Sequence, residues 1–424
     1  VIYSYADRYL FQANVRHDGS SRFAKGYRWG TFPSFSAGWV ASEEKFMKNL
    51  KWDWLSFLKL RGSWGMLGNE RIGSNYFPYI ALMSFGNSLF YMADGSVVSD
   101  KTARPAVLAV EDITWETTTS TDLGLDVNFL NNRLQFHFDY YWKETKDMLL
   151  NIEIPYFMGY NNPSTNAGKM STHGYDIEVA WNDQIGDFKY GVNVNFSDFL
   201  SKIDYMNDGE QISGGKIKRA GVLFNEFYGY VCEGIYQTQE EVNNSARTST
   251  TVTVGDLKYR DISGPDGVPD GVISPEYDRV PLGNSLPRFQ YGGSLNASYK
   301  GIDFSLAFQG IGKQNSYLST SMVQPLRDNY GNVPAILEGK YWSPFNTTEE
   351  NLAAKYPRLS NVSKSNNYAT SNFWMFNGSY FRLKNITLGY TLPKSWTQKA
   401  GINRARFYVS GSDLFCLSNF PSGW

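Results

Sequence analysis

Hydrophobic and polar side chains alternate along residues 286–312 in two segments that are joined by Lys300-Gly301. A period of two places the two kinds of side chain on opposite faces of a β-strand and excludes a helix, whose period is 3.6. The hydrophobic faces are Phe289, Tyr291, Leu295, Ala297 and Tyr299 in the first segment, and Ile302, Phe304, Leu306, Phe308 and Gly310 in the second. Both segments are about as long as a tilted strand that crosses a membrane.

The same alternation predicts about eleven strands along the chain. They cover residues 9–16, 27–41, 58–64, 115–130, 133–149, 171–181, 188–200, 286–299, 302–312, 378–392 and 402–416. Asn131-Asn132 predicts a two-residue hairpin turn. Short helical turns are predicted at residues 42–47, 237–243 and 393–400. A slip of the hydrophobic face within the strand at 378–392 predicts a β-bulge near Lys384-Asn385.

Short turns between these strands alternate with long connections near residues 65–113, 150–170, 201–285 and 314–377. Long loops at one end and short turns at the other are typical of outer-membrane barrels. The pattern therefore predicts an all-β fold, a transmembrane antiparallel β-barrel whose hydrophobic face contacts lipid and whose polar face lines a wet lumen. The alternative is a soluble sandwich, in which the hydrophobic faces of two sheets pack on each other.

Composition separates these two folds only in part. Aromatic residues make up 16% of the chain, with 29 Tyr, 28 Phe and 12 Trp, and aromatic girdles belong to barrel rims. No window contains the eighteen or so continuous apolar residues of a transmembrane helix. The 40 basic and 41 acidic side chains give a net charge of −1, which argues against a nucleic-acid partner because such proteins carry a basic face.

Candidate catalytic and metal-binding residues are few. The two cysteines, Cys232 and Cys416, show no metal-ligand spacing and are interpreted as structural, with one bridge between them left open. The three histidines are scattered over separate predicted strands: His17, His137 and His173. Carboxylate pairs such as Glu43-Glu44 lie in polar turns, and no glycine-rich phosphate loop is present. The sequence predicts that the chain is not an enzyme.

Several motifs spread over the chain resemble one family. They are RHDGSSRF (Arg16–Phe23), RWGTFPSFSAGW (Arg28–Trp39), LKLRGSWG (Leu58–Gly65), WETT to GLD (Trp115–Asp126), GY with EGIY (Gly229–Tyr236) and YFRLKNITLGY (Tyr380–Tyr390). Together they resemble the SusC-like (SusC/RagA) branch of TonB-dependent outer-membrane transporters of Bacteroidota.

The resemblance implies a barrel of about 22 strands with an N-terminal plug in the lumen. This chain then corresponds to roughly the last half of the barrel, in a multi-pass protein of the bacterial outer membrane, in contact with its lipid. The plug, the TonB box and the early strands are expected to lie outside the given sequence. The resemblance also implies energised import: a SusD-like surface lipoprotein captures a glycan, or in some members a peptide, and the TonB–ExbB–ExbD complex pulls on the plug.

Aromatic side chains in the long loops are the candidate substrate contacts under this resemblance, because flat rings stack on the C–H faces of sugars. They are Tyr156, Phe157, Tyr160, Phe224, Phe227, Tyr228, Trp342 and Trp374. The alternative is that these rings pack the loops together or belong to the girdle.

An acidic loop at residues 261–278 is the candidate metal site. Related members carry a pattern that is similar to a calcium loop, and the matching oxygens here belong to Asp261, Ser263, Asp266 and Asp270. Pro265 interrupts the spacing and no Glu stands at the closing position, although Asp278 follows. The alternative is a set of Asx and glycine turns without a metal ion or any other cofactor.

Three functions follow from these patterns. The favoured one is an outer-membrane active importer of oligosaccharides (nutrient glycans), with oligopeptides as the alternative cargo. A secreted β-rich carbohydrate-binding protein is the alternative of another class, and a passive porin, which needs neither plug nor lipoprotein, is the third. The sequence does not name the cargo, since aromatic and Asn-rich loops suit both sugars and peptides.

Overall fold

The computed structural model describes residues 1–50, 52–71, 76–151, 154–207, 209–321, 323–327 and 331–421, without the side chains of Val107, Asn151, Tyr156 and Ala400. The chain divides into two compact units. Unit 1 comprises residues 1–184, 191–209 and 219–222, and unit 2 comprises residues 185–190, 210–218 and 223–424. None of the helices in the described residues is long and apolar enough to cross a membrane.

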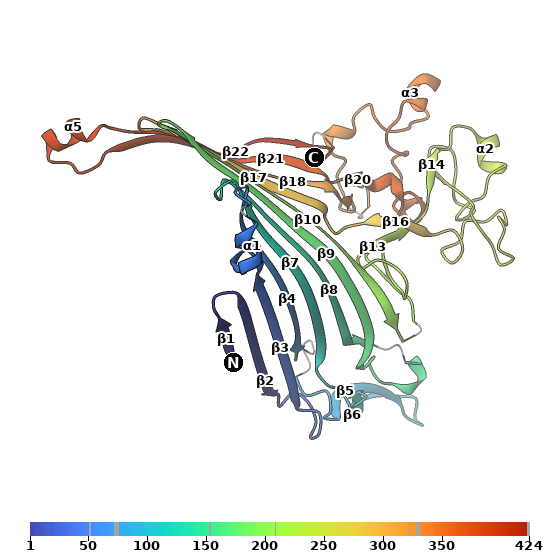
Figure 1. Ribbon diagram of the computed structural model, residues 1–424. Coiled ribbons are helices and arrows are strands. Elements are labelled where there is room, and N and C mark those ends of the chain that lie inside the picture. The colour runs from blue at the N-terminus through green and yellow to red at the C-terminus, as the bar shows by residue number, and fades with distance from the viewer. Residues whose placement is uncertain are drawn as a thin grey trace. The chain divides into compact units, whose positions relative to one another are not determined.

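Eight strands, of which all but β1 are long, form the antiparallel sheet of unit 1 in the order β1-β2-β3-β4-β7-β8-β9-β10. Their bounds are β1 Ile2–Tyr5, β2 Tyr9–Gly19, β3 Trp29–Val40, β4 Leu55–Asn69, β7 Glu116–Phe129, β8 Leu134–Asn151, β9 Ser164–Ile185 and β10 Phe188–Met206. Sequential neighbours pair because each is joined to the next by a turn or loop at the strand end. In Figure 1 they lie side by side as one curved layer.

Strand register confirms the predicted alternation in unit 1. Leu123 of β7 lies opposite Tyr140 of β8, and Asp126 lies opposite His137. Hydrophobic residues therefore continue one face from strand to strand, and polar residues continue the other. The hydrophobic face is not covered, since Leu123 is 53% exposed and Trp142 is 44% exposed. Such a face suits lipid and is not the packed interior of a soluble sandwich.

The connections in unit 1 alternate between short and long. Between β3 and β4 lie the 3₁₀-helix η1 Ala41–Glu43 and the helix α1 Lys45–Asn49. The long connection after β4 contains a separate hairpin, β5 Leu82–Tyr91 and β6 Val97–Val107, and the connection after β8 contains η2 Tyr156–Met158. The predicted two-residue turn at Asn131-Asn132 is wider, because residues 130–132 all have positive φ and the strands stop at Phe129 and Leu134.

A small hydrophobic core lies at the loop end of unit 1. It consists of Phe23, Phe32, Ile113 and Trp115, all less than 8% exposed. The indole N–H of Trp115 also donates a hydrogen bond to the Arg28 carbonyl (3.1 Å). Three of the sequence motifs described above therefore meet in one cluster that holds the loops to the strand ends.

Four long strands form the sheet of unit 2: β17 Arg288–Tyr299, β18 Ile302–Lys313, β21 Tyr380–Thr391 and β22 Arg406–Ser418. The hydrophobic residues of the two segments at 286–312 lie on the same face of the sheet. Leu295 of β17, for example, pairs with Leu306 of β18. The predicted β-bulge is confirmed. Phe308 pairs with Leu383 and Ala307 pairs with Asn385, so Lys384 is the extra residue.

Short elements fill the two long connections of unit 2. The first contains β11 Gln211–Ser213, β12 Lys216–Lys218, β13 Glu226–Gly229, β14 Cys232–Ile235, α2 Gln239–Asn243, β15 Leu257–Tyr259 and β16 Val280–Asn284. The second contains β19 Asn315–Tyr317, η3 Ala335–Leu337, α3 Thr348–Leu352, α4 Lys364–Asn367, η4 Asn372–Trp374 and β20 Met375–Asn377. The turn between β21 and β22 contains α5 Lys394–Thr397 and η5 Gln398–Ala400.

The sequence predicted eleven of the twelve strands that form the sheets of the two units. It missed the β5–β6 hairpin and the short strands inside the long connections. It also missed β1, which pairs with β2 from Ile2 to Tyr5. Four residues are too short a segment for a period of two to stand out. The three predicted helical turns are confirmed, and α2 begins after Thr238, whose side chain accepts a hydrogen bond from the Glu241 amide.

Candidate functional site

Charged side chains pair across the polar face of unit 1. Arg61 on β4 lies 3.3 Å from Asp126 on β7 (Nε to Oδ1) and 2.6 Å from Asp139 on β8 (Nη1 to Oδ1). His137 Nδ1 lies 3.0 Å from Asp126 Oδ1. These residues meet because the period of two brings one residue from each neighbouring strand to the same level. The result is a hydrated, mainly acidic surface.

A hollow of about 450 Å³ opens on the same polar face, over strands β2, β3 and β4. Its polar lining consists of Gln12, Asn14, Arg16, Asp18, Ser34, Ser36, Ser63 and Ser120. Amide, hydroxyl and charged groups converge there. Apolar side chains of Phe32, Phe35, Trp64, Met66 and Leu67 complete the lining, so the hollow offers a hydroxyl-rich or peptide ligand both hydrogen bonds and apolar contacts.

The two long connections of unit 2 join into one folded part, called here the loop body (residues 223–285 and 314–379). Tyr230 donates a backbone hydrogen bond to the Thr370 carbonyl (2.8 Å), and Cys232 donates one to Asn372 Oδ1 (2.7 Å). A hydrophobic core of Tyr230, Leu257, Tyr259 and Ile273 lies within the loop body, each residue 5% exposed or less. Loops of this size therefore hold a fixed shape.

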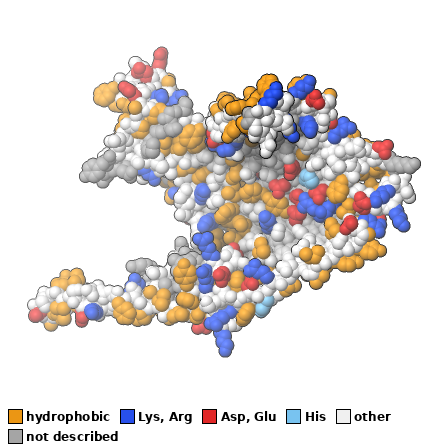
Figure 2. Space-filling view, turned by 90° about the vertical axis from the view of Figure 1, so that its left-hand side faces the viewer, with side chains coloured by type: hydrophobic (Ala, Val, Ile, Leu, Met, Phe, Trp, Pro, Cys, Tyr) orange, Lys and Arg blue, Asp and Glu red, His pale blue; other side chains and the backbone are white. Residues whose placement is uncertain are grey.

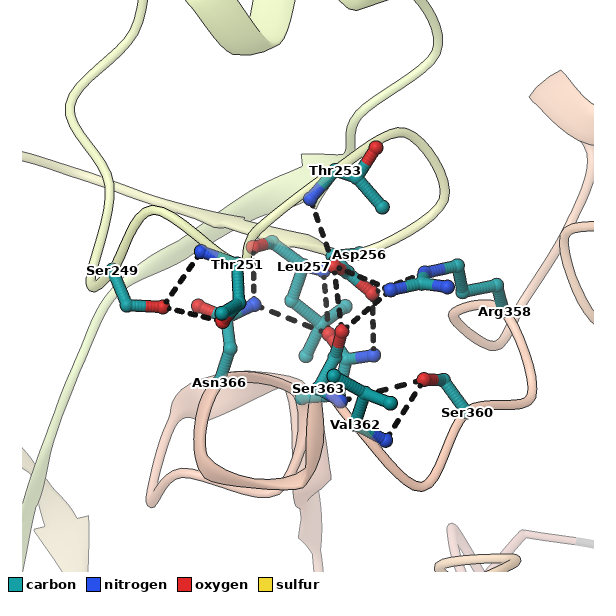
Figure 3. Close-up of polar contacts among 11 residues, drawn as sticks. Ser249, Thr251, Thr253, Asp256, Leu257, Arg358, Ser360, Val362, Ser363 and Asn366 are labelled. Carbon is teal, nitrogen blue, oxygen red and sulfur yellow. Dashed lines mark hydrogen bonds and ion pairs between the residues drawn. The ribbon is translucent and has the colours of Figure 1, made fainter.

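A buried carboxylate, Asp256, binds the two connections together (Figure 3). Its side chain is fully buried and accepts hydrogen bonds from Arg358 Nε (2.8 Å), Ser363 Oγ (2.9 Å) and Asn367 Nδ2 (2.9 Å). The Thr253 amide donates a further hydrogen bond (3.0 Å). Because every donor is in place, the charge is held inside the loop body without an unpaired acceptor.

Asn366 and Asn367 extend this network to the neighbouring strand β15. Asn366 Nδ2 donates to the Leu257 carbonyl (2.9 Å), and the Leu257 amide donates to Asn367 Oδ1 (2.9 Å). The hydroxyl of Tyr259 donates to the Asn366 carbonyl (2.6 Å). Side-chain amides thus substitute for a neighbouring strand and satisfy the backbone of β15 on that side.

Four of the eight aromatic residues predicted to bind substrate are buried in unit 2. Phe227 is 5% exposed, Tyr228 is 8%, Trp342 is 8% and Trp374 is 4%. The indole of Trp374 donates to the Asn367 carbonyl (2.7 Å), and its ring lies 4.9 Å from that of Phe373. These rings pack the loops, which was the alternative interpretation, and their contact with substrate stays a prediction.

The other predicted aromatic residues differ in exposure. Phe157 is 88% exposed, while Tyr160 and Phe224 are half-buried. Tyr156 begins η2, and its side chain lies outside the described part of the structure. Phe157 is therefore the predicted contact whose ring is most open to a ligand.

The acidic loop is closed by its own backbone. Asp278 is fully buried and accepts hydrogen bonds from the amides of Ile262 (2.7 Å) and Ser274 (2.7 Å). Asp261 accepts from the Gly271 amide (2.7 Å), and Asp270 accepts from the Val272 amide (2.9 Å). Across the described residues, no group of three or more His, Cys, Asp or Glu is arranged to hold a metal ion. Calcium binding by Asp261, Ser263, Asp266 and Asp270 stays a prediction.

Burial changes the acidity of several groups in the loop body. It raises the pKa of the Cys232 thiol to about 11, and it raises the pKa of Tyr236 and of Tyr368 to about 12. Burial also raises the pKa of the Tyr259 phenol well above its ordinary value. These groups stay neutral at physiological pH, so none of them supplies a nucleophile or a base. Cys232 and Cys416 are both free thiols, so the bridge left open by the sequence is not formed.

Sequence reasoning missed the Asp256 network. Asp256 and Arg358 lie 102 residues apart, and neither stands in a recognisable motif. The polar face of β4 was foreseen, because Lys59 and Arg61 alternate with leucines, but its partners on β7 and β8 depend on register. The alternation in the three strands was the available signal for the charged row.

A family model described as "TonB dependent receptor-like, beta-barrel" matches residues 2–410. The chain belongs to this family. TonB-dependent receptor P3 of Formosa agariphila is 32% identical over 99% of the chain, and the chain spans 41% of its length. TonB-dependent receptor SusC of Bacteroides thetaiotaomicron is 30% identical over 99% of the chain, which spans 40% of SusC.

Solved structures agree on the fold. The structure described as the RagAB peptide transporter superimposes with a TM-score of 0.77 at 24% identity, over 99% of this chain and 43% of that chain. The RagAB peptide importer in its "open-open" state gives a TM-score of 0.73 at 22% identity. The prediction of a partial antiparallel barrel of the SusC-like type is confirmed.

Family membership decides between the alternative classes. The chain is a SusC-like barrel protein of the bacterial outer membrane, so the secreted carbohydrate-binding protein is excluded. The family is one of receptors that depend on TonB, which sets it apart from passive porins and agrees with the prediction that the chain is not an enzyme. The chain spans about two fifths of its relatives, so the activity of the whole protein is a matter for proposal.

Proposed function

We propose that this chain is part of an active importer of oligosaccharides that works with a SusD-like surface lipoprotein and is energised by the TonB–ExbB–ExbD complex. The observation that carries the proposal is the 30% identity to SusC over 99% of the chain. In this role the strands supply one wall of the barrel. The long connections supply the surface that meets the lipoprotein and the cargo.

Two features of the structure support a hydrophilic cargo. The hollow on the polar face of unit 1 carries amides, hydroxyls and charged groups beside its apolar side chains, and these polar groups replace the hydration of a sugar. Phe157 adds an exposed ring on which a sugar C–H face stacks. A peptide backbone is the alternative cargo, because it uses the same donors and acceptors.

The experiment begins with the full-length protein, extracted from its native outer membrane in mild detergent. Mass spectrometry of the co-eluting proteins should find one lipoprotein in stoichiometric amount. An importer that elutes with no lipoprotein would contradict the proposed partnership. Uptake of labelled oligosaccharides and of labelled peptides by cells with and without TonB then separates the two cargoes.

Phe157→Ala provides a sharper test of the substrate contact. The variant should weaken binding of the accepted cargo by about fivefold, because stacking on an exposed aromatic ring is worth roughly 1 kcal/mol. Phe345→Ala is the matched control, since Phe345 is 96% exposed and was not predicted to bind. Equal binding by the two variants would remove Phe157 from the site.

A calcium titration tests the acidic loop. Because Asp261, Asp270 and Asp278 already accept amide hydrogen bonds, the loop should keep its resistance to protease when calcium is removed by a chelator. A loss of resistance that calcium restores, and magnesium does not, would establish a calcium site there.

A further inference from the structure

The turn between β21 and β22 projects beyond its neighbours in unit 2. Residues 392–405, called here the tip, follow the last strand pair, Thr391 and Arg406. The Thr391 amide donates to the Gly301 carbonyl in the β17–β18 turn (2.7 Å), so the whole tip lies past that turn. Figure 1 shows α5 at the far end of this hairpin.

The tip has a defined conformation. The Trp396 amide donates to the Pro393 carbonyl (3.0 Å) at the start of α5, and Thr397 is only 3% exposed. Gly401 has a φ of 68° and ends η5, after which the Ile402 amide donates back to the Thr397 carbonyl (3.0 Å). A left-handed glycine with this returning hydrogen bond is a common helix end. The exposed side chains of the tip are therefore presented by a folded turn.

Two large hydrophobic side chains of the tip are exposed, Trp396 at 62% and Ile402 at 48%. Figure 2 views the molecule from the side on which α5 lies in Figure 1, and hydrophobic, basic and acidic side chains all reach the surface on that side. The nearby strand ends add Tyr299 and Tyr390, which are 46% and 38% exposed. Exposed aromatic residues at strand ends form the girdle that marks the membrane interface.

The tip is also basic. It contains Lys394, Lys399 and Arg404 and no Asp or Glu, although the whole chain has a net charge of −1. Among the described residues, neither lysine of the tip lies within 4.0 Å of a carboxylate. By contrast, Lys300 in the neighbouring turn is paired with Asp187 (3.9 Å). The positive charges of Lys394 and Lys399 are thus left for a partner outside the chain.

We infer that the tip docks on a layer of anionic phospholipid headgroups at the membrane surface on the short-turn side of the barrel. Trp396 and Ile402 enter the interface between headgroups and acyl chains, where amphipathic rings reside. Lys394, Lys399 and Arg404 contact lipid phosphates. The inference depends on the outer-membrane location of the protein and not on its cargo. A failure of the proposed oligosaccharide import would therefore leave it unchanged.

The test places a spin label on the tip of the full-length protein through Gln398→Cys, with Cys232 and Cys416 replaced by Ser. The protein is reconstituted in vesicles of phosphatidylethanolamine alone or with phosphatidylglycerol. Collisions with oxygen, which concentrates in the membrane, and with a water-soluble nickel chelate report the depth of the label. A label at Phe345→Cys is the reference for a solvent-exposed site.

The label on the tip should lie at headgroup depth and lie deeper when phosphatidylglycerol is present. The double variant Lys394→Gln/Lys399→Gln should shift the label from the membrane into water. The ratio of membrane-immersed to water-exposed label should fall about fivefold for each lysine removed. Trp396→Ser should expose the label in both lipids. Lys340→Gln with Lys355→Gln removes the same charge from the loop body and should change nothing.

Three results would overturn the inference. A label as accessible to the nickel chelate as the reference means that the tip stays in water. Equal depth in the two lipids means that the net negative charge of the headgroups does not hold the tip. Protection that is the same in detergent without lipid, or that appears only when a periplasmic protein is added, means that the tip docks on protein.

Discussion

Breaking the pair between Asp256 and Arg358 should loosen the loop body. Among the described residues, Arg358 is the only cation that forms an ion pair with Asp256. Arg358→Ala removes this cation and leaves a carboxylate whose side chain is 0% exposed. Breaking a buried ion pair on one side costs about 3–5 kcal/mol. Thr253, Ser363 and Asn367 still donate hydrogen bonds, so we expect the lower end, about 3 kcal/mol.

Hydrogen exchange of the full-length protein in detergent measures this effect. The reporter is the Leu257 amide, which is buried and hydrogen-bonded to Asn367 within the network. A loss of about 3 kcal/mol corresponds to exchange that is faster by about two orders of magnitude. Amides of the long strands in unit 1 should keep their rates, because the change is local to the loop body.

Arg260→Ala is the matched control. Arg260 forms an ion pair of similar length with Glu233 (2.9 Å), but the two side chains are 58% and 35% exposed. A surface pair of this kind is worth about 0–1 kcal/mol, so exchange at Leu257 should change little. If Arg260→Ala and Arg358→Ala had equal effects, the argument that burial makes the Asp256 pair costly to break would be refuted.

A double variant separates charge from packing. Asp256→Asn with Arg358→Gln removes both charges and keeps similar volumes, so it should be less destabilising than the sum of the two single changes. A strictly additive result would show that the two side chains act independently.

Three further predictions concern the loop body. Gly229→Ala should destabilise it by about 1–3 kcal/mol in a thermal melt, because a Cβ there would lie 2.1 Å from a carbonyl oxygen of the facing loop. Gly86 is the control: no atom lies near its added Cβ, so Gly86→Ala should leave the melt unchanged. Since the pKa of Tyr259 is raised in the folded state, the stability of the loop body should be intact below pH 10 and fall as the pH rises above it. The measurement is phenolate absorbance together with the rate of proteolysis. Equal resistance to protease at pH 12 and at pH 9 would contradict this prediction. At pH 8 maleimide should modify the exposed Cys416 well before Cys232, whose pKa near 11 keeps it a thiol, and equal rates would contradict the burial of Cys232.

Sequence alone determined eleven of the strands, their two faces and the bulge at Lys384. These are properties of consecutive residues, because a strand turns successive side chains to opposite sides and an extra residue shifts the pattern at once. The pairing of Leu295 with Leu306 and of Asp126 with His137 then follows from turn positions. Membership of the family was also visible in the motifs.

Only the tertiary structure decided what the motifs and the loops do. Phe23, Phe32 and Trp115 come from three separate motifs and share one core, while Asp256 finds Arg358 across 102 residues. The rings of Trp342 and Trp374 were predicted to stack on sugars, but segments distant in the chain bury them. Irregular segments carry no period, so the burial of a side chain there depends on long-range contacts that local sequence does not encode.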